Sequence, residues 1–245
     1  MVLTNFELLY LCLESFLPPL QRQVRQRLKS LVKEFGNGRN LRVLDVGGRK
    51  SHYTTGVPAL VTILDLPRES ELQQQLHLGL LPSQIENLRA RRSNIERVVL
   101  EDMTRCTLPD NLFDLVVSVE VLEHVEEDAS FIRQVHRVLK PGGTFLMTTP
   151  NGDFVKNTNP DHKRHYTFAQ LHRLLASEFI GVQIEYAIRG GTFRRYGLKS
   201  WSPRKPLQTT MSMFGNVING LQSSSSKIKT QAYGTHHLVA TARKR

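Results

Sequence analysis

The stretch Arg42-Val-Leu-Asp-Val-Gly-Gly48 decides the fold. Its apolar residues predict a short buried strand over 42–46, and its two glycines predict a tight turn directly afterwards. A strand that ends near an acidic residue, here Asp45, and continues into a glycine turn is a general arrangement for holding a nucleotide-like ligand. Glycine allows this because a Cβ atom would collide with the ligand. A purely structural turn would explain two glycines equally well, so the turn alone does not identify a ligand.

Short apolar runs alternate with helical patterns on the C-terminal side of this strand. Six further strands are expected, at 60–64, 97–100, 115–119, 144–148, 180–187 and 237–241. Helices are expected at 68–78, 84–92 and 128–139, and another after Thr167, which has capping-box spacing to Gln170. Strands alternating with helices indicate an α/β fold, with a mostly parallel seven-stranded sheet and helices on both faces.

The regions that flank this pattern divide the chain into four parts. Residues 1–38 predict an N-terminal helical extension, because apolar residues recur at helical spacing until Gly36-Asn-Gly38. Residues 39–189 form the expected core. Residues 190–234 are a basic insertion, either substrate-facing or flexible, with a short helix at 211–221. Residues 235–245 hold the last core strand and a basic tail.

Charge is distributed unevenly along the chain. The net charge is +11, and residues 151–245 contain 15 Lys or Arg against 4 Asp or Glu, whereas residues 1–150 contain 18 of each kind. Basic segments of this kind associate with anionic partners, so residues 189–245 could meet RNA or an anionic membrane surface, or could be a solvated tail. No apolar run is long enough to span a bilayer, the start does not have the pattern of a signal peptide, and the two cysteines form no framework. These features predict a cytoplasmic protein.

Two further acidic residues follow predicted strands. Asp65 comes 20 residues after Asp45 and directly follows the strand at 60–64, and Asp102 follows the strand at 97–100. Ligands of α/β sheets collect at the carboxyl ends of the strands, where an acidic side chain can accept hydrogen bonds from ribose hydroxyls. The three aspartates are therefore expected at the same edge of the sheet.

Two longer segments carry a family resemblance. They are Phe113-Asp-Leu-Val-Val-Ser-Val-Glu-Val-Leu-Glu-His-Val125 and Val138-Leu-Lys-Pro-Gly-Gly-Thr-Phe-Leu-Met-Thr-Thr-Pro-Asn151. In this order, after a Leu-Asp-Val-Gly turn, they resemble the class I S-adenosylmethionine-dependent methyltransferases, in the group that includes ubiquinone-pathway O-methyltransferases. The resemblance covers about residues 40–180. It implies a Rossmann-like fold, S-adenosylmethionine as cofactor, and residues 39–189 as the methyltransferase core.

The resemblance also implies which residues hold the cofactor. Asp45, Gly47 and Gly48 would line its methionine end, and Asp65 would bind the ribose hydroxyls. The family turn usually carries a third glycine, but Arg49-Lys50-Ser51 occupies that stretch here. A basic residue there could lie near the carboxylate of the cofactor, or the loop could have lost cofactor binding.

Three more positions complete the implied cofactor pocket. Asp102 would contact the adenine amino group, with Met103 beside the ring, and the backbone near Val119 would close the pocket. Asp102 could instead cap a helix or turn. No covalent enzyme intermediate is needed for methyl transfer, because the reaction is a displacement at carbon that requires alignment of nucleophile, methyl group and sulfur.

The candidate catalytic residues are Glu120, His124 and His162. If a helix begins at Glu120, then Glu120, Glu123 and His124 share one face. These three side chains could bind Mg²⁺ or another divalent cation together with His162 or His165, as small-RNA 2′-O-methyltransferases do with a similar Glu-x-x-Glu-His group. Alternatively, one histidine acts as a base that a carboxylate orients, or His124 merely packs against the pocket.

The methyl acceptor is left open by these patterns. The segment 149–167 follows the fifth strand, and its polar and aromatic residues are expected to face the substrate; they are Asn151, Asp161, His162, His165 and Tyr166. The primary hypothesis is methyl transfer to an O or N nucleophile of a small molecule or a lipid or glycan precursor. The alternatives are an RNA methyltransferase that uses the basic C-terminal third, and a non-catalytic binding module with the same fold.

Overall fold

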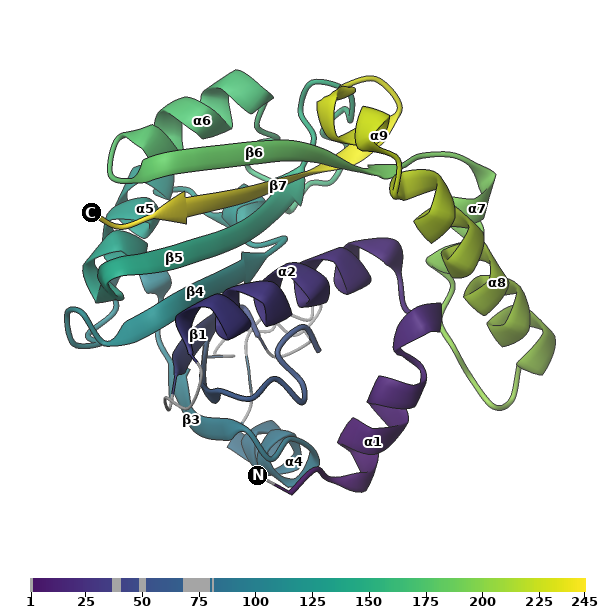
Figure 1. Cartoon of the computed structure of the whole chain (residues 1–245), viewed down its shortest axis with the longest axis horizontal. Helices are drawn as coiled ribbons and strands as arrows, with labels where there is room; N and C mark the ends of the chain where they lie inside the picture. The colour runs from purple at the N-terminus through teal and green to yellow at the C-terminus, as the bar shows by residue number, and fades with distance from the viewer. Residues whose placement is uncertain (1, 37–40, 49–51, 68–79, 81) are drawn as a thin grey trace.

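Seven strands form one sheet in the computed structural model, which describes residues 2–36, 41–48, 52–67, 80 and 82–245. The order across the sheet is β3-β2-β1-β4-β5-β7-β6 (Figure 1). The strands are β1 (Arg42–Val46), β2 (Leu60–Asp65), β3 (Ile95–Leu100), β4 (Phe113–Val119), β5 (Leu139–Pro150), β6 (Ile180–Arg189) and β7 (Thr235–Arg243). The first five pair in parallel, and β7 runs antiparallel between β5 and β6. The predicted mostly parallel, Rossmann-like sheet is therefore confirmed.

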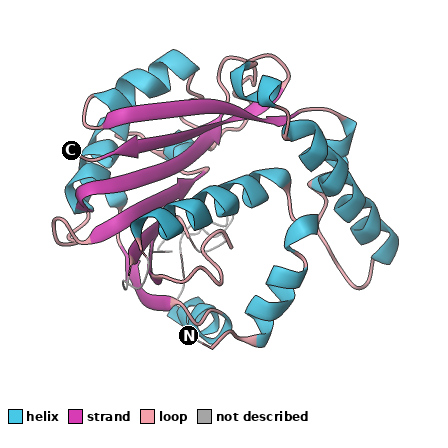
Figure 2. Cartoon of the chain, in the orientation of Figure 1, coloured by secondary structure: helices cyan, strands magenta, loops and turns pink. Residues whose placement is uncertain are grey.

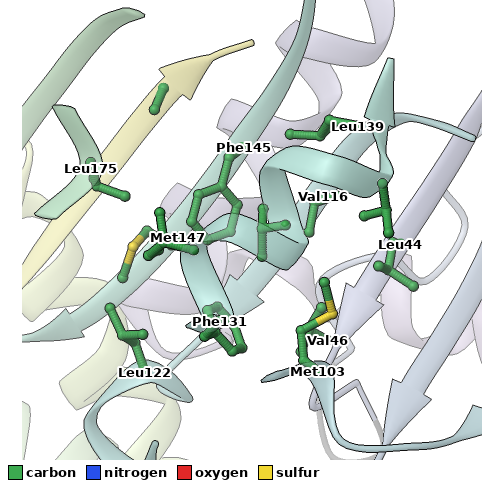
Figure 3. Packing of buried hydrophobic residues seen from close by; sticks show 14 of the residues in the cluster. Leu44, Val46, Met103, Val116, Leu122, Phe131, Leu139, Phe145, Met147 and Leu175 are labelled. Atoms are coloured by element: carbon green, nitrogen blue, oxygen red, sulfur yellow. The ribbon is translucent and has the colours of Figure 1, made fainter. Parts of the chain in front are cut away.

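Helices cover both faces of the sheet, which explains why the central strands are apolar on both sides (Figure 2). On one face, α2 (Pro19–Phe35) buries Val24, Leu28 and Val32 against β1, β2 and β4. On the other face lie α5 (Asp128–Val138) and α6 (Phe168–Ala176). Figure 3 shows this second cluster, in which Phe131 of α5 lies among Phe145 and other strand residues. The expected Thr167–Gln170 capping box begins α6.

The N-terminal extension is helical, as expected, and is tied to the core by polar contacts. It contains α1 (Asn5–Cys12), the 3₁₀ turn η1 (Glu14–Phe16) and α2. Thr4 and Glu7 form a capping box at the start of α1. The fully buried Glu7 carboxylate also accepts hydrogen bonds from the backbone N–H and hydroxyl of Ser93, which joins α4 (Pro82–Arg91) to β3. The helix expected at 68–78 lies outside the described residues.

The segment between β6 and β7 folds into helices. These are α7 (Thr192–Gly197), α8 (Pro206–Ser223) and α9 (Ser226–Thr230). The short helix expected at 211–221 is thus the second half of the longer α8. Within the described part of the chain, no helix combines the length and apolarity needed to cross a membrane.

His52 provides a test of how the extension is packed, because its ring contacts Phe6 and Tyr10 of α1. Burial, with help from Arg92, Arg91 and Arg25, lowers the pKa of His52 to about 4. The unfolded chain therefore binds a proton at a higher pH than the folded chain, and the stability that the neutral ring provides is lost as the pH falls from about 6.5 through 4.

We expect His52→Phe to remove this acid sensitivity. The wild-type free energy of unfolding should fall by up to about 3 kcal/mol more than that of His52→Phe between about pH 7 and pH 4. Urea unfolding at a series of pH values measures this difference. His172→Phe, at an exposed position of α6, is the matched control and should retain the wild-type slope; equal slopes for His52→Phe and wild type would contradict the prediction.

Candidate functional site

The turn after β1 is built so that a side chain can lie under it. Gly47 has a φ of 72°, and its N–H donates to the Leu64 carbonyl at 2.8 Å. A Cβ atom on Gly48 would stand 2.7 Å from Cγ of Asp45, so glycine is required for the buried carboxylate to fold back against the turn. Asp45 accepts a hydrogen bond from the hydroxyl of Thr54 at 2.7 Å, and Thr54 is in turn contacted by Arg92. The Asp45 side chain thus supports the turn from below. The stretch Arg49-Lys50-Ser51, where the family turn usually carries a third glycine, lies outside the described residues.

The two later aspartates stand at the carboxyl ends of their strands, as expected. Asp65 is the last residue of β2, and the Leu66 N–H donates to its Oδ1 at 2.9 Å. Asp102 caps the 3₁₀ turn η2 (Met103–Arg105), because its Oδ1 accepts from the N–H and hydroxyl of Thr104. The Asp102 side chain is 36% exposed, and its Oδ2 lies 3.9 Å from Nε of Arg105. Met103 is buried in the apolar cluster of Figure 3.

The chain leaves β4 differently from the expected helix at Glu120. Glu120 adopts a left-handed conformation with a φ of 54°, and only a single 3₁₀ turn, η3 (Leu122–His124), follows. This conformation is rare for a residue with a Cβ atom and is costly unless its surroundings enforce it. Glu120 therefore lies outside η3 and outside the group of ligand atoms that Glu123, His124 and His162 bring together, so the expectation that Glu120, Glu123 and His124 share one helical face is wrong.

The Glu120 carboxylate contacts the sheet instead. It accepts a hydrogen bond from the Thr148 hydroxyl at 2.8 Å and lies 3.2 Å from Nδ1 of His237 on β7. Burial alone would raise the pKa of Glu120, but His237 and Thr148 hold this pKa below its ordinary value. Nε2 of His237 lies 3.4 Å from the half-buried guanidinium of Arg194 on α7. Because Arg194 can only donate, His237 Nε2 is the acceptor in this contact.

Glu123, His124 and His162 form a second cluster, whose ligand atoms all lie within 4.8 Å of one another. Glu123 is fully buried; its Oε2 accepts from the Thr149 hydroxyl at 3.2 Å, and its Oε1 has no hydrogen-bond partner among the residues that the structure describes. Burial, followed by the charge of Glu120, raises the pKa of Glu123. An unsatisfied buried oxygen is costly unless a proton or a cation occupies it.

Backbone carbonyls fix which nitrogen each imidazole presents. His124 Nδ1 donates to the Asp161 carbonyl at 3.1 Å, which leaves His124 Nε2 with a lone pair. His165 Nδ1 donates to the Val155 carbonyl at 2.9 Å, so its Nε2 accepts from Nδ1 of His162 at 2.8 Å. His162 therefore also presents Nε2 as a lone pair, and burial with the neighbouring imidazoles lowers the pKa of His162. Both rings are held in the tautomer that a metal ligand or a base requires.

Other residues of the segment 149–167 hold the structure together. Asn151 is buried, and its amide donates to the carbonyls of Ala232 and Thr235. The Tyr166 hydroxyl donates to Asp128 at 2.8 Å. Asn151 and Tyr166 thus make contacts within the fold, and the substrate-facing role expected of this segment stays a prediction.

Sequence reasoning did not single out His237 or assign Arg194 to the site. Arg194 appeared only as one of many basic residues in the C-terminal third. His237 pairs with Pro150 because β7 runs antiparallel, and so the start of β7 lies at the same edge as the ends of β4 and β5. The adjacent His236-His237 pair at the start of the last predicted strand was the one available signal.

Part of the chain is similar in sequence to known methyltransferases. Residues 36–147 match the model of a methyltransferase domain. A Mycolicibacterium smegmatis protein named "probable S-adenosylmethionine-dependent methyltransferase" is 34% identical over 125 residues, which are 49% of this chain and 47% of that protein. The ubiquinone biosynthesis O-methyltransferase of Serratia proteamaculans is 29% identical over 57% of this chain and 55% of that protein. The chain thus matches about half the length of these relatives.

Solved structures share the fold over most of the chain. A methyltransferase from Archaeoglobus fulgidus, described as SAM dependent, aligns with 90% of this chain and 94% of its own, with a TM-score of 0.54 and 16% identity. This structural match covers most of the chain, whereas the family model matches residues 36–147, which hold β1 to β4 and most of β5. Residues 36–147 are therefore similar in sequence to the methyltransferase domain, and the chain has the fold of solved methyltransferases.

Proposed function

We propose that the protein transfers a methyl group from S-adenosylmethionine to an O or N nucleophile of a small molecule or of a lipid or glycan precursor. One observation carries the proposal: the implied cofactor residues and the Glu120–His237 and Glu123–His124–His162 groups converge on the same carboxyl edge of the sheet. A cofactor and an acceptor bound at this edge would meet between these groups.

The cofactor would lie across the ends of the first strands. Gly47 and Gly48 allow the methionine end to approach the backbone, and Asp65 would accept hydrogen bonds from the ribose hydroxyls. Oδ2 of the partly exposed Asp102 side chain would accept from the adenine amino group while Oδ1 caps η2. Val119, at the end of β4, would close the pocket through its backbone. Asp45 acts beneath the turn, and Met103 supports the adenine side from the core.

The remaining polar residues would align and deprotonate the acceptor. The Nε2 lone pairs of His124 and His162 can take a proton from a hydroxyl or ammonium group as it attacks the methyl carbon. Glu120 stays ionised beside His237 and so would hold that ring, and through it Arg194, at the edge of the acceptor site. We assign Glu120 a positioning role and the two imidazoles the proton transfer.

A divalent cation also fits the second cluster. One buried carboxylate oxygen, which has no partner in the described part of the chain, and two Nε2 lone pairs offer a mixed oxygen and nitrogen ligand set, which suits several ions, including Mg²⁺. Such a cation would lower the pKa of an acceptor hydroxyl that it contacts. Glu120 falls outside this set, so we propose Glu123, His124 and His162 as its ligands.

Chelation tests the cation. If the ion assists catalysis, treatment with a chelator should lower turnover by at least about tenfold, and added Mg²⁺ or Mn²⁺ should restore it. His162→Ala should lower turnover and abolish the response to added metal, whereas His172→Ala should do neither. Turnover that is unchanged after chelation would reject the metal and leave the imidazoles as bases.

RNA is the alternative acceptor, and one feature favours it. Arg194 reaches the site, and exposed Arg195 and Lys199 lie next to it on and after α7, so phosphates could approach the same edge. Binding of RNA by these residues should weaken steeply as salt is added. The absence of nuclease sensitivity in the assay below would remove this alternative.

Two measurements test the proposed function together. Calorimetry should detect binding of S-adenosylmethionine and S-adenosylhomocysteine to the whole chain. A deuterated methyl group should then appear in a component of cell-extract fractions, and mass spectrometry of fractions with and without nuclease distinguishes a small acceptor from RNA. Failure to bind the cofactor would indicate a non-catalytic binding module and contradict the proposal.

A further inference from the structure

The helix α8 exposes its apolar side and buries its polar side, which is the reverse of a normal surface helix. Its exposed side carries large apolar residues at helical spacing: Leu207 is 75% exposed, Met211 42%, Phe214 64% and Leu221 71%. These positions follow one another by four, three and seven residues, so they form one stripe along the helix. The stripe runs over about 20 Å, since each residue advances an α-helix by 1.5 Å.

The opposite side of α8 is small and polar, and it is buried. It consists of Ser212, Gly215, Asn216, Asn219 and Ser223. Ser212 contacts the Gly197 carbonyl at 3.0 Å, the Asn216 amide donates to the Phe16 carbonyl at 2.9 Å, and the Asn219 amide donates to the Arg189 carbonyl at 2.8 Å. These bonds connect α8 to α7, to η1 and to the end of β6.

Close packing of α8 against α7 also fixes the orientation of α8. A Cβ atom on Gly215 would stand 3.0 Å from the Phe193 carbonyl and from Cβ of Tyr196, so the two helices meet backbone to backbone. The Arg22 guanidinium of α2 also donates to the Asn216 carbonyl at 2.9 Å. Rotation of α8 to bury its apolar stripe would break all of these contacts. The folded protein therefore presents the stripe outward, and Figure 1 shows α8 at the edge of the molecule beside α7.

The charged residues around the stripe indicate which kind of partner surface the stripe binds. Helix α8 contains no charged residue, and residues 186–245 contain no Asp or Glu. Exposed basic residues flank both ends of the stripe; they are Arg195, Lys199, Arg204 and Lys205 before it and Lys227 and Lys229 after it. A nucleic acid would satisfy these charges but would leave the leucines and Phe214 in water. A second copy of the same face would cover the leucines but would bring the basic clusters together.

We propose that α8 docks the protein on an anionic lipid surface, with its apolar stripe at the boundary of the acyl chains and the flanking lysines and arginines on the headgroups. In this arrangement the apolar stripe contacts the acyl chains and the basic residues contact the headgroups, as in other helices that bind at a membrane interface. The proposal goes beyond the proposed function. It does not require methyl transfer, and it holds for any acceptor.

Vesicle flotation of the full chain tests the docking without cofactor or substrate, so its failure is distinct from failure of the methyl-transfer proposal. The protein should float with vesicles of phosphatidylcholine mixed with phosphatidylglycerol, and much less with phosphatidylcholine alone. Leu207→Gln with Phe214→Gln should lower the bound fraction by about tenfold or more, because both side chains lie in the stripe. Ile180→Gln, an exposed apolar residue at the start of β6, is the matched control and should bind like wild type.

The charge component has its own pair of variants. Arg204→Glu should reduce binding several-fold, and Arg133→Glu, which makes the same charge change at an exposed position of α5, should not. Unfolding midpoints should be equal for all variants, since each altered side chain is exposed. Absence of flotation with the anionic vesicles would overturn the proposal, as would a dimer in sedimentation velocity that Leu207→Gln with Phe214→Gln dissociates. Tight RNA binding with no vesicle binding would overturn it in favour of a nucleic-acid surface.

Discussion

Asp65→Ala should lower the affinity for S-adenosylmethionine by about a hundredfold, the largest effect that we expect on ligand binding. The carboxylate would accept hydrogen bonds from the two ribose hydroxyls, and hydrogen bonds to a charged group contribute roughly 1.5–3 kcal/mol each. Two such bonds, partly offset by water that replaces them, correspond to about 3 kcal/mol, or roughly two orders of magnitude in the dissociation constant. Calorimetric titration with S-adenosylmethionine measures this change directly.

The control for Asp65→Ala changes an aspartate that lies away from the carboxyl edge of the sheet. Asp110 lies before β4, is 65% exposed and pairs with Arg137, so Asp110→Ala changes the same charge without approaching the implied cofactor. We expect Asp110→Ala to bind like wild type. Asp65→Asn separates shape from charge and should retain part of the affinity, because an amide oxygen still accepts one hydrogen bond. An Asp65→Ala variant with wild-type affinity would remove Asp65 from the cofactor site.

The sheet was predictable because its signals are local. The apolar runs at 42–46 and 115–119 and the capping box at Thr167 depend on neighbouring residues, and tertiary structure did not change them. The length of α8 was less accessible to sequence analysis. Its buried side is polar and its exposed side apolar, so an amphipathic pattern read in the usual way assigns the wrong face to the core.

The candidate site depended on contacts that sequence spacing does not encode. Glu120, Glu123 and His124 have helical spacing, yet the left-handed backbone at Glu120 turns its carboxylate toward Thr148 and His237. His237 is more than a hundred residues away in the sequence and reaches Glu120 only because β7 is inserted antiparallel beside β5. By contrast, the family resemblance led us to expect that His162 or His165 lies near His124, and the structure places His162 in one cluster with Glu123 and His124.

The N-terminal extension is linked to the implied cofactor site through one side chain. Arg25 of α2 is fully buried, and its guanidinium donates to the carbonyls of His52, Tyr53 and Thr55 at 2.8–3.1 Å. The same group pairs with Glu14 of η1 at 3.1 Å. These carbonyls belong to the loop that carries Thr54, whose hydroxyl donates to Asp45 beneath the glycine turn. The extension therefore fixes the loop that braces the turn.

Arg25→Met should consequently lower the free energy of unfolding by about 3–5 kcal/mol, because three carbonyls, two of them in part-buried hydrogen bonds and one in a buried hydrogen bond, lose their donor and Glu14 loses one of its two cationic partners. Urea denaturation followed by circular dichroism measures the loss. Arg27→Met, two residues along the same helix, removes only a partly exposed pair with Glu185 and should cost less than about 1 kcal/mol.

The same variant also tests the link from the extension to the cofactor. At temperatures where Arg25→Met is still folded, its affinity for S-adenosylmethionine should fall as well, since the loop at 52–55 no longer holds Thr54 against Asp45. Arg27→Met should leave that affinity unchanged. Arg25→Met could instead be strongly destabilised and yet bind the cofactor as tightly as wild type. That result would show that α2 stabilises the fold without supporting the turn after β1.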